Sequence, residues 1–172
     1  MKKLCLSIIS FILVMTISVN AFAKPFNPAE YTSVDEHSEL LPEGVSQSKA
    51  SEHAVFRGDF FVSADLMMTD KGDGNIGALA VAYMQYPVDE VYISIYLDCL
   101  DEESERWRQV TYYDAEFYKK DFPDGLITPS VDIVFQKQKK GEYYRLRGAF
   151  AAYSLGAVEG FSPTTAGIKL EK

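Results

Sequence analysis

The feature that most constrains the fold is a strict alternation of side chains over residues 88–100. Apolar side chains occupy every second position, namely Val91, Ile93, Ile95 and Leu97. Polar or aromatic side chains stand between them, namely Tyr92, Ser94, Tyr96 and Asp98. A period of two residues is typical of a β-strand that buries one face, whereas a helix repeats its apolar residues every three or four positions.

Similar runs recur from residue 54 onward, separated by turn signals rich in Gly, Pro, Asp and Lys. We expect strands at residues 59–69, 78–86, 88–100, 105–115, 130–136, 142–153 and 165–170. Residues 112–121 are ambiguous, since residues 116–120 could close a short helix. This pattern predicts an all-β fold, an antiparallel β-sandwich of about seven strands, with a small barrel as the alternative.

The first 23 residues have the composition of a secretory signal peptide. Lys2 and Lys3 precede an apolar run over residues 4–19, and Ala21 and Ala23 are the small residues that signal peptidase needs. The run is shorter than the roughly 20 residues of a membrane-spanning helix. We therefore expect cleavage after Ala23 and a secreted, extracellular product.

The chain after the cleavage site divides into two parts. Residues 24–53 are rich in Ser, Glu, Pro and Asn without sustained periodicity, which predicts a flexible polar segment. Residues 54–172 are the expected β-sandwich domain. Loss of Lys2 and Lys3 leaves 15 of the 17 basic side chains against 25 acidic ones. This balance argues against a nucleic-acid partner, and no later apolar stretch predicts a stable membrane anchor.

Cysteine usage excludes an intramolecular disulfide in the secreted chain. Cys5 belongs to the predicted signal peptide and lies too near the start for a lipoprotein-type cleavage, so only Cys99 remains. Its position continues the register of Leu97, which predicts a small buried residue and no nucleophile. Stability must then come from core burial.

The catalytic inventory argues against an enzyme. His37 and His53 both fall in the polar segment, so the domain has no histidine base for a Ser or Cys nucleophile. No His or Cys spacing suits zinc, and we expect no metal and no cofactor. Acidic pairs such as Glu102 with Glu103, or Asp114 with Glu116, are typical of solvated turns and leave a small carboxylate-based hydrolase as a distant alternative.

Two short motifs have a plainer structural interpretation. Residues 70–75, Asp-Lys-Gly-Asp-Gly-Asn, resemble a calcium loop, but Gly72 and Val81 stand where an EF-hand needs ligands. We expect a hairpin turn there. Residues 57–59 spell Arg-Gly-Asp, the integrin-recognition tripeptide, but Asp59 opens a predicted strand, so a structural use is favoured over an adhesive one.

The C-terminal third carries a family resemblance. Residues 144–150, Tyr-Arg-Leu-Arg-Gly-Ala-Phe, with Ser162-Pro163-Thr164 before the last strand, resemble the two final strands of fibronectin type III modules. Gly148 departs from that pattern, because a branched apolar residue is usual there. Residues 88–170 as a whole look like small secreted proteins of unknown function from Gram-positive bacteria. The resemblance implies an immunoglobulin or fibronectin type III-like sandwich and names no activity.

The candidate binding site is a face of interleaved tyrosines and arginines. In a sandwich of this type, strands 88–100 and 142–153 are neighbours, and their outward side chains share one face, namely Tyr92, Tyr96, Tyr143, Arg145 and Arg147. Such a face suits sugars or peptides, because rings supply rigid area and guanidinium groups supply fixed donors. Cross-strand pairing of the same side chains, with no ligand, is the structural alternative.

Three functions are therefore open. The first is a secreted non-catalytic protein that binds a cell-surface glycan or protein. The second is a structural or matrix subunit that assembles through free strand edges. The carboxylate-based hydrolase is the third.

Overall fold

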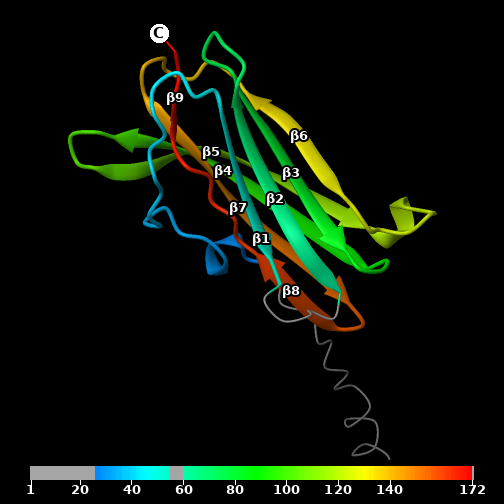
Figure 1. Cartoon of the computed structure of the whole chain (residues 1–172). Coiled ribbons are helices and arrows are strands. Elements are labelled where there is room, and N and C mark those ends of the chain that lie inside the picture. The colour runs from blue at the N-terminus through cyan, green and yellow to red at the C-terminus, as the bar shows by residue number, and fades with distance from the viewer. Residues whose placement is uncertain (1–25, 55–59, 172) are drawn as a thin grey trace, which may run out of the picture.

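The computed structural model describes residues 26–54 and 60–171. It consists of two antiparallel β-sheets packed face to face (Figure 1), so the expected all-β sandwich is confirmed. The predicted signal peptide at residues 1–23 and the Arg-Gly-Asp tripeptide at 57–59 lie outside the described residues. Within the two described ranges, no helix has the length and apolar character needed to cross a membrane.

The first sheet has the strand order β1-β2-β3-β6, and the second has the order β5-β4-β7-β8, with β9 also paired to β7. The strands are β1 (Gln47–His53), β2 (Phe61–Asp70), β3 (Ile76–Met84), β4 (Glu90–Asp101), β5 (Arg106–Tyr118), β6 (Ser130–Phe135), β7 (Tyr143–Ser154), β8 (Ala157–Phe161) and β9 (Ile168–Lys169). Two short 3-10 turns, η1 (Pro28–Glu30) and η2 (Lys119–Asp121), complete the elements. The ambiguous residues 112–121 thus continue β5 as far as Tyr118 and then form the 3-10 turn η2.

The core lies between the two sheets, where the alternation places it. The four apolar residues of β4 from Val91 to Leu97 are all 0 % exposed. The expected pairing of β4 with β7 is also present, with Ile95 opposite Gly148. A side chain at Gly148 would meet the ring of Phe150 at 2.5 Å, so this position needs glycine because β7 packs tightly against the core.

The facing of β2 differs from the expected one at its start. Alternation predicts Val62 on the same face as Ala64 and Phe61 on the other, yet Phe61 is buried and Val62 is 46 % exposed. The cause is a shift in the β2–β3 register between Phe61 and Ser63. A β-bulge adds a residue to one strand and reverses the facing beyond it.

The polar segment before residue 54 has more structure than its composition predicts. Residues Gln47–His53 form β1, which pairs with β2 along its whole length. Ser51 donates a 2.6 Å hydrogen bond to Asp65, and Lys49 forms an ion pair with the same carboxylate. The expectation of a flexible segment over 24–53 therefore does not hold for β1, because backbone pairing supplies the order that the few apolar residues cannot.

The hairpin expected at residues 70–75 is confirmed between β2 and β3. Lys71 and Asn75 close it through a 2.9 Å backbone hydrogen bond, and the Asp70 carboxylate accepts one from the Gly72 N–H. Gly72 and Gly74 both have positive φ angles, which glycine adopts at no steric cost. The motif thus has a complete structural explanation.

Candidate functional site

The five residues of the predicted Tyr/Arg face project outward from the second sheet. Tyr92 and Tyr96 come from β4, whereas Tyr143, Arg145 and Arg147 come from β7. The β4–β7 register places Tyr96 opposite Arg147, so these two are brought together as expected. The face is not open, however. Arg145 is 0 % exposed and Arg147 is 2 % exposed, so the expectation of two free guanidinium groups does not hold.

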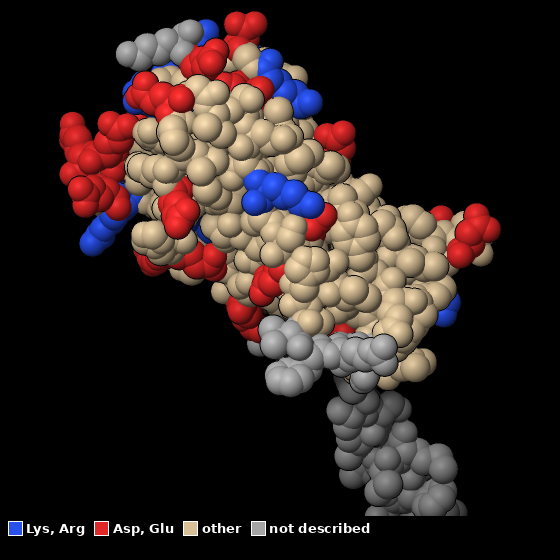
Figure 2. All heavy atoms as spheres, in the orientation of Figure 1, with Lys and Arg blue, Asp and Glu red and all other residues tan. Residues whose placement is uncertain are grey.

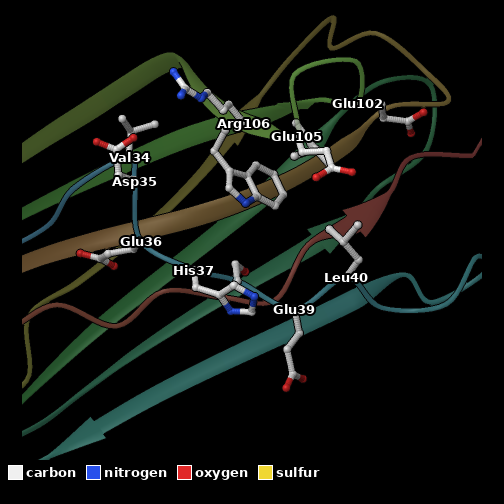
Figure 3. Close-up of a pocket in the computed structure, with 12 residues that line it drawn as sticks. Val34, Asp35, Glu36, His37, Glu39, Leu40, Glu102, Glu105 and Arg106 are labelled. Atoms are coloured by element: carbon white, nitrogen blue, oxygen red, sulfur yellow. The ribbon is translucent and has the colours of Figure 1, made fainter.

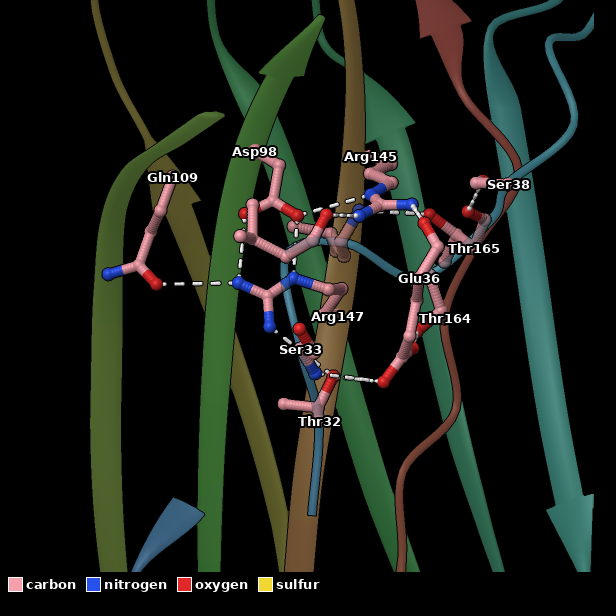
Figure 4. Close-up of polar contacts among 12 residues, drawn as sticks. Thr32, Ser33, Glu36, Ser38, Asp98, Gln109, Arg145, Arg147, Thr164 and Thr165 are labelled. Carbon is pink, nitrogen blue, oxygen red and sulfur yellow. Dashed lines mark hydrogen bonds and ion pairs between the residues drawn. The ribbon is translucent and has the colours of Figure 1, made fainter. Parts of the chain in front are cut away.

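Asp98 of β4 is the anion that holds these two arginines inside the protein (Figure 4). Its Oδ2 atom accepts hydrogen bonds from Arg145 Nε at 3.1 Å and from Arg147 Nε at 2.6 Å. Its Oδ1 atom accepts a third, from Arg147 Nη2 at 3.1 Å. A buried charge is tolerated only when it is paired and hydrogen-bonded, so these three residues, the arginine cluster, form one unit.

The N-terminal segment over residues 32–40, here called the strap, covers the arginine cluster. Arg145 donates to the carbonyl oxygens of Glu36 at 2.5 Å and Val34 at 2.7 Å. Arg147 Nη1 donates to Thr32 Oγ1 at 3.3 Å. A guanidinium has five donors in a fixed planar fork, which suits several acceptors at once. The arginines therefore fix the path of a segment that has no regular secondary structure.

The Glu36 carboxylate ties the strap to the chain's C-terminal part. It accepts hydrogen bonds from Thr164 Oγ1 at 2.7 Å, from the Ser33 N–H at 2.9 Å and from Thr32 Oγ1 at 3.0 Å. Burial acts to raise the pKa of Glu36, but these hydrogen bonds and the charge of Arg147 hold the pKa below its usual value. The carboxylate thus stays ionised as part of the strap's attachment.

Aromatic rings complete the surroundings of the two guanidinium groups. The guanidinium carbon of Arg145 lies 4.4 Å from the centre of the Trp107 ring, and that of Arg147 lies 4.9 Å from the centre of the Tyr96 ring. Stacking of this kind is favourable because the ring face carries partial negative charge. Trp107 belongs to β5 opposite Leu100, which places it on the outer face beside the strap.

Tyr92 and Tyr143 lie apart from the arginine cluster. Tyr92 belongs to an aromatic group with Phe26, Tyr118 and Tyr153, at ring-centre distances of 5.5, 6.3 and 5.6 Å. Burial, followed by a hydrogen bond to Glu90, raises the pKa of Tyr92. The ammonium group of Lys169 lies 5.3 Å from the centre of the Tyr143 ring. The five predicted residues are therefore distributed over three separate environments.

A pocket of about 660 Å³ opens between the strap and the β4–β5 hairpin (Figure 3). Strap residues 34–40 form one wall. The other wall comes from the hairpin, namely Leu100, Glu102, Glu105, Arg106 and Trp107. In the close-up, His37 and Leu40 lie on the strap side, across from Glu105 and Arg106. Arg145 contacts both walls, since it bonds the strap carbonyls and stacks on Trp107.

The lining of this pocket combines apolar side chains with mostly acidic ones. Trp107, Leu40 and Leu100 supply the apolar surface, and four exposed carboxylates stand around it, namely Asp35, Glu39, Glu102 and Glu105. Figure 2 shows acidic side chains gathered at the left, over the β4–β5 hairpin of Figure 1. An aromatic ring beside carboxylates suits a ligand with an apolar body and a positive charge.

Sequence reasoning missed Asp98 and Glu36 as members of this site and left Trp107 unassigned to a face. The alternation places Asp98 on the same outward face as Tyr96. A single carboxylate on a face with arginines predicts an ion pair with one of them, so the sequence does contain a signal for this contact. The sequence leaves it open which face of its strand carries Trp107, since the parity of residues 105–115 is unclear. In the structure the β4–β5 register shifts between Leu97 and Asp98, and Trp107 lies opposite Leu100. Nothing in the local sequence marks Glu36 as an anchor, since its partners lie far along the chain.

The described residues contain no group of three His, Cys, Asp or Glu side chains placed to hold a metal ion. Comparison with known proteins gives no further guide. No protein-family model matches the chain, and no curated protein matches it either.

Proposed function

We propose that this protein is a secreted, non-catalytic binding protein and that its ligand occupies the pocket between the strap and the β4–β5 hairpin. The observation that carries the proposal is the pocket itself, with the Trp107 ring beside exposed carboxylates. The ligand class is a cationic group on a cell-surface glycan or protein, such as an amino sugar or a lysine side chain. Aromatic surface and carboxylates recognise such groups together.

Rigidity of the pocket supports binding. Arg145 is fully buried and joins both walls, so the pocket is preformed and a ligand loses less free energy to ordering. Exposure of the carboxylates supports a non-catalytic role. Acid–base catalysis usually relies on a carboxyl group held in a desolvated site, whereas Glu102 and Glu105 lie exposed on a turn.

The test uses the tryptophan, which is the only one in the chain. Its emission should change when the purified protein is titrated with chitosan oligosaccharides or a lysine-rich peptide, and change little with uncharged chitin oligosaccharides. Glu102→Gln and Glu105→Gln should weaken the response, because each removes a carboxylate from the pocket rim.

Glu103→Gln is the matched control, since Glu103 lies on the same turn but does not line this pocket. A response to neutral and cationic sugars alike would contradict the ligand class. If no probe changes the emission and no cell-surface fraction retains the protein, the binding proposal fails.

The structural-subunit alternative is favoured by one observation. β5 is an edge strand of 13 residues with exposed aromatic side chains, which is the free edge that assembly requires. If β5 pairs with a different edge strand of the next copy, the assembly stays open and electron microscopy of the concentrated protein should show filaments.

A further inference from the structure

The strap lies between two apolar anchors but adds nothing to the core itself. Before it, the ring centre of Phe26 lies 5.2 Å from that of Tyr31 and 5.5 Å from that of Tyr92. After it, Leu41 and Val45 pack against the core. Among the described residues, the apolar core and the side chains packed against it include none from the strap. A segment with few buried apolar contacts opens at a lower free energy than the core strands do.

Hydrogen bonds hold the strap to the sandwich (Figure 4). Arg145 donates to two of its carbonyl oxygens, and Thr164 donates to the Glu36 carboxylate. Ser38 donates to the Thr165 carbonyl oxygen at 2.6 Å. Water can replace each of these partners when the strap lifts, and it also solvates the arginine cluster, whose burial is costly. Lifting the strap therefore costs less free energy than separating an apolar interface.

The same segment forms one wall of the pocket, since residues 34–40 line it opposite the β4–β5 hairpin (Figure 3). Lifting the strap removes that wall and exposes Arg145 and Arg147 to solvent. We propose that the strap is a gate of the pocket: it lifts off the arginine cluster as one unit between its two anchors, and a ligand in the pocket holds it closed. This inference rests on the binding function proposed above and adds its regulation. The structure shows the closed form, which is the form that binds.

Two measurements on the ligand-free protein detect opening of the strap. The Gly167 N–H donates to the Glu39 carbonyl oxygen at 2.7 Å, so its hydrogen exchange, followed by NMR, reports release of one end of the strap. Arg145 is 0 % exposed, so phenylglyoxal, a reagent for guanidinium groups, should modify it only when the strap lifts. Both rates should indicate opening that is more frequent than global unfolding. The amides of Ile93 and Ile95 give the global reference, because β4 is paired on both sides.

Thr164→Val tests whether the strap opens as a unit. It removes the hydroxyl group that holds the Glu36 carboxylate and leaves the pocket lining unchanged. Both rates should rise by the same factor, about tenfold or more, because the lost hydrogen bond is made to a charged group. Ser51→Ala is the matched control, since it removes a hydroxyl group that donates to the Asp65 carboxylate on the other sheet. It should change neither rate.

Ligand binding provides the second test. Chitosan oligosaccharide at about ten times its dissociation constant, determined from tryptophan emission, should lower the exchange rate of the Gly167 N–H about tenfold, because it binds only the closed form. The uncharged chitin oligosaccharide is the control and should leave this rate unchanged.

The outcomes separate the gate from the binding function. Strap opening no more frequent than global unfolding, or unequal changes of the two rates in Thr164→Val, would overturn the gate and leave the binding function standing. Emission that responds to chitosan while the Gly167 exchange rate stays constant would overturn the link between ligand and gate. Frequent strap opening with no emission response would support the gate and contradict the proposed ligand.

Discussion

Gly167 lies directly against the ring of Trp107. A Cβ atom at position 167 would stand 2.9 Å from Trp107 Cη2 and 2.9 Å from Leu40 Cδ2, closer than carbon atoms pack. The end of the strap pairs with this glycine through the backbone, because the Gly167 N–H donates to the Glu39 carbonyl oxygen and the N–H of Leu41, just after the strap, donates to the Gly167 carbonyl oxygen. Gly167 thus sets the spacing between the strap, the C-terminal segment and the wall of the pocket.

Gly167→Ala should destabilise the protein by about 1–3 kcal/mol, the usual cost of overpacking. The ring of Trp107 is rigid and is held by Arg145 on β7, so it cannot yield as a flexible chain end would. Urea unfolding measures the loss, and tryptophan emission should shift in the folded state. Gly77→Ala is the control, since the three atoms nearest to its added methyl group all belong to the end of the flexible Lys71 side chain. Equal losses in both variants would contradict this account.

Asp98→Asn should cost about 3–5 kcal/mol, because it leaves two guanidinium groups buried without their anion. Asp65→Asn provides the comparison. Its carboxylate pairs with Lys49 at the surface, where the ammonium side chain is 53 % exposed, so a loss of about 1 kcal/mol or less is expected. Both are measured by denaturant unfolding at neutral pH. Similar losses would show that the arginine cluster is no more costly to break than a surface pair.

Glu36→Gln should show a pH-dependent deficit. The pKa of Glu36 is lowered in the folded protein, so its carboxylate adds stability above the unfolded pKa, near 4.5, and that stability is lost as pH falls through the folded pKa. The variant should be less stable than wild type by about 1 kcal/mol at pH 7. The difference should shrink below about pH 4. A deficit that stays constant on acidification would mean that the charge of Glu36 is irrelevant.

Cys99 should react slowly with a thiol reagent in the native state. Burial raises the pKa of its thiol, and the side chain packs partly against the core, with Sγ 3.7 Å from the Leu100 carbonyl oxygen. The reactive thiolate is therefore scarce at pH 8. The rate should rise sharply in urea. A native rate close to the unfolded one would show that the end of β4 opens readily.

The sandwich could be predicted because its information is local. The alternation from Val91 to Leu97 predicts both the strand and which of its faces is buried. The turn at residues 70–75 has glycines at the positions that need positive φ angles. The expected β4–β7 pairing followed from the fold class. Seven strands were expected, whereas β1 and β8 were missed because their sequences lack an alternation of apolar and polar residues.

The candidate site could not be predicted in the same way, because it depends on contacts between distant residues. Alternation placed Arg145 and Arg147 on the outer face correctly, yet an outer face is exposed only if nothing covers it. The strap covers it through hydrogen bonds from the arginines to backbone carbonyl oxygens, which any residue possesses. The residue types in the strap therefore do not predict these hydrogen bonds.

The strap also determines the order in which the molecule is completed. Glu36 bonds Arg145 across 109 positions and Thr164 across 128 positions, among the longest sequence separations in the protein. Contacts between such distant residues form slowly, because a long loop must close first. A ribosome synthesises Glu36 early, but its partners come only near the end of the chain. We therefore expect the strap to be fixed late in folding, and a chain truncated before Thr164 lacks one of the hydrogen bonds that hold the strap in place.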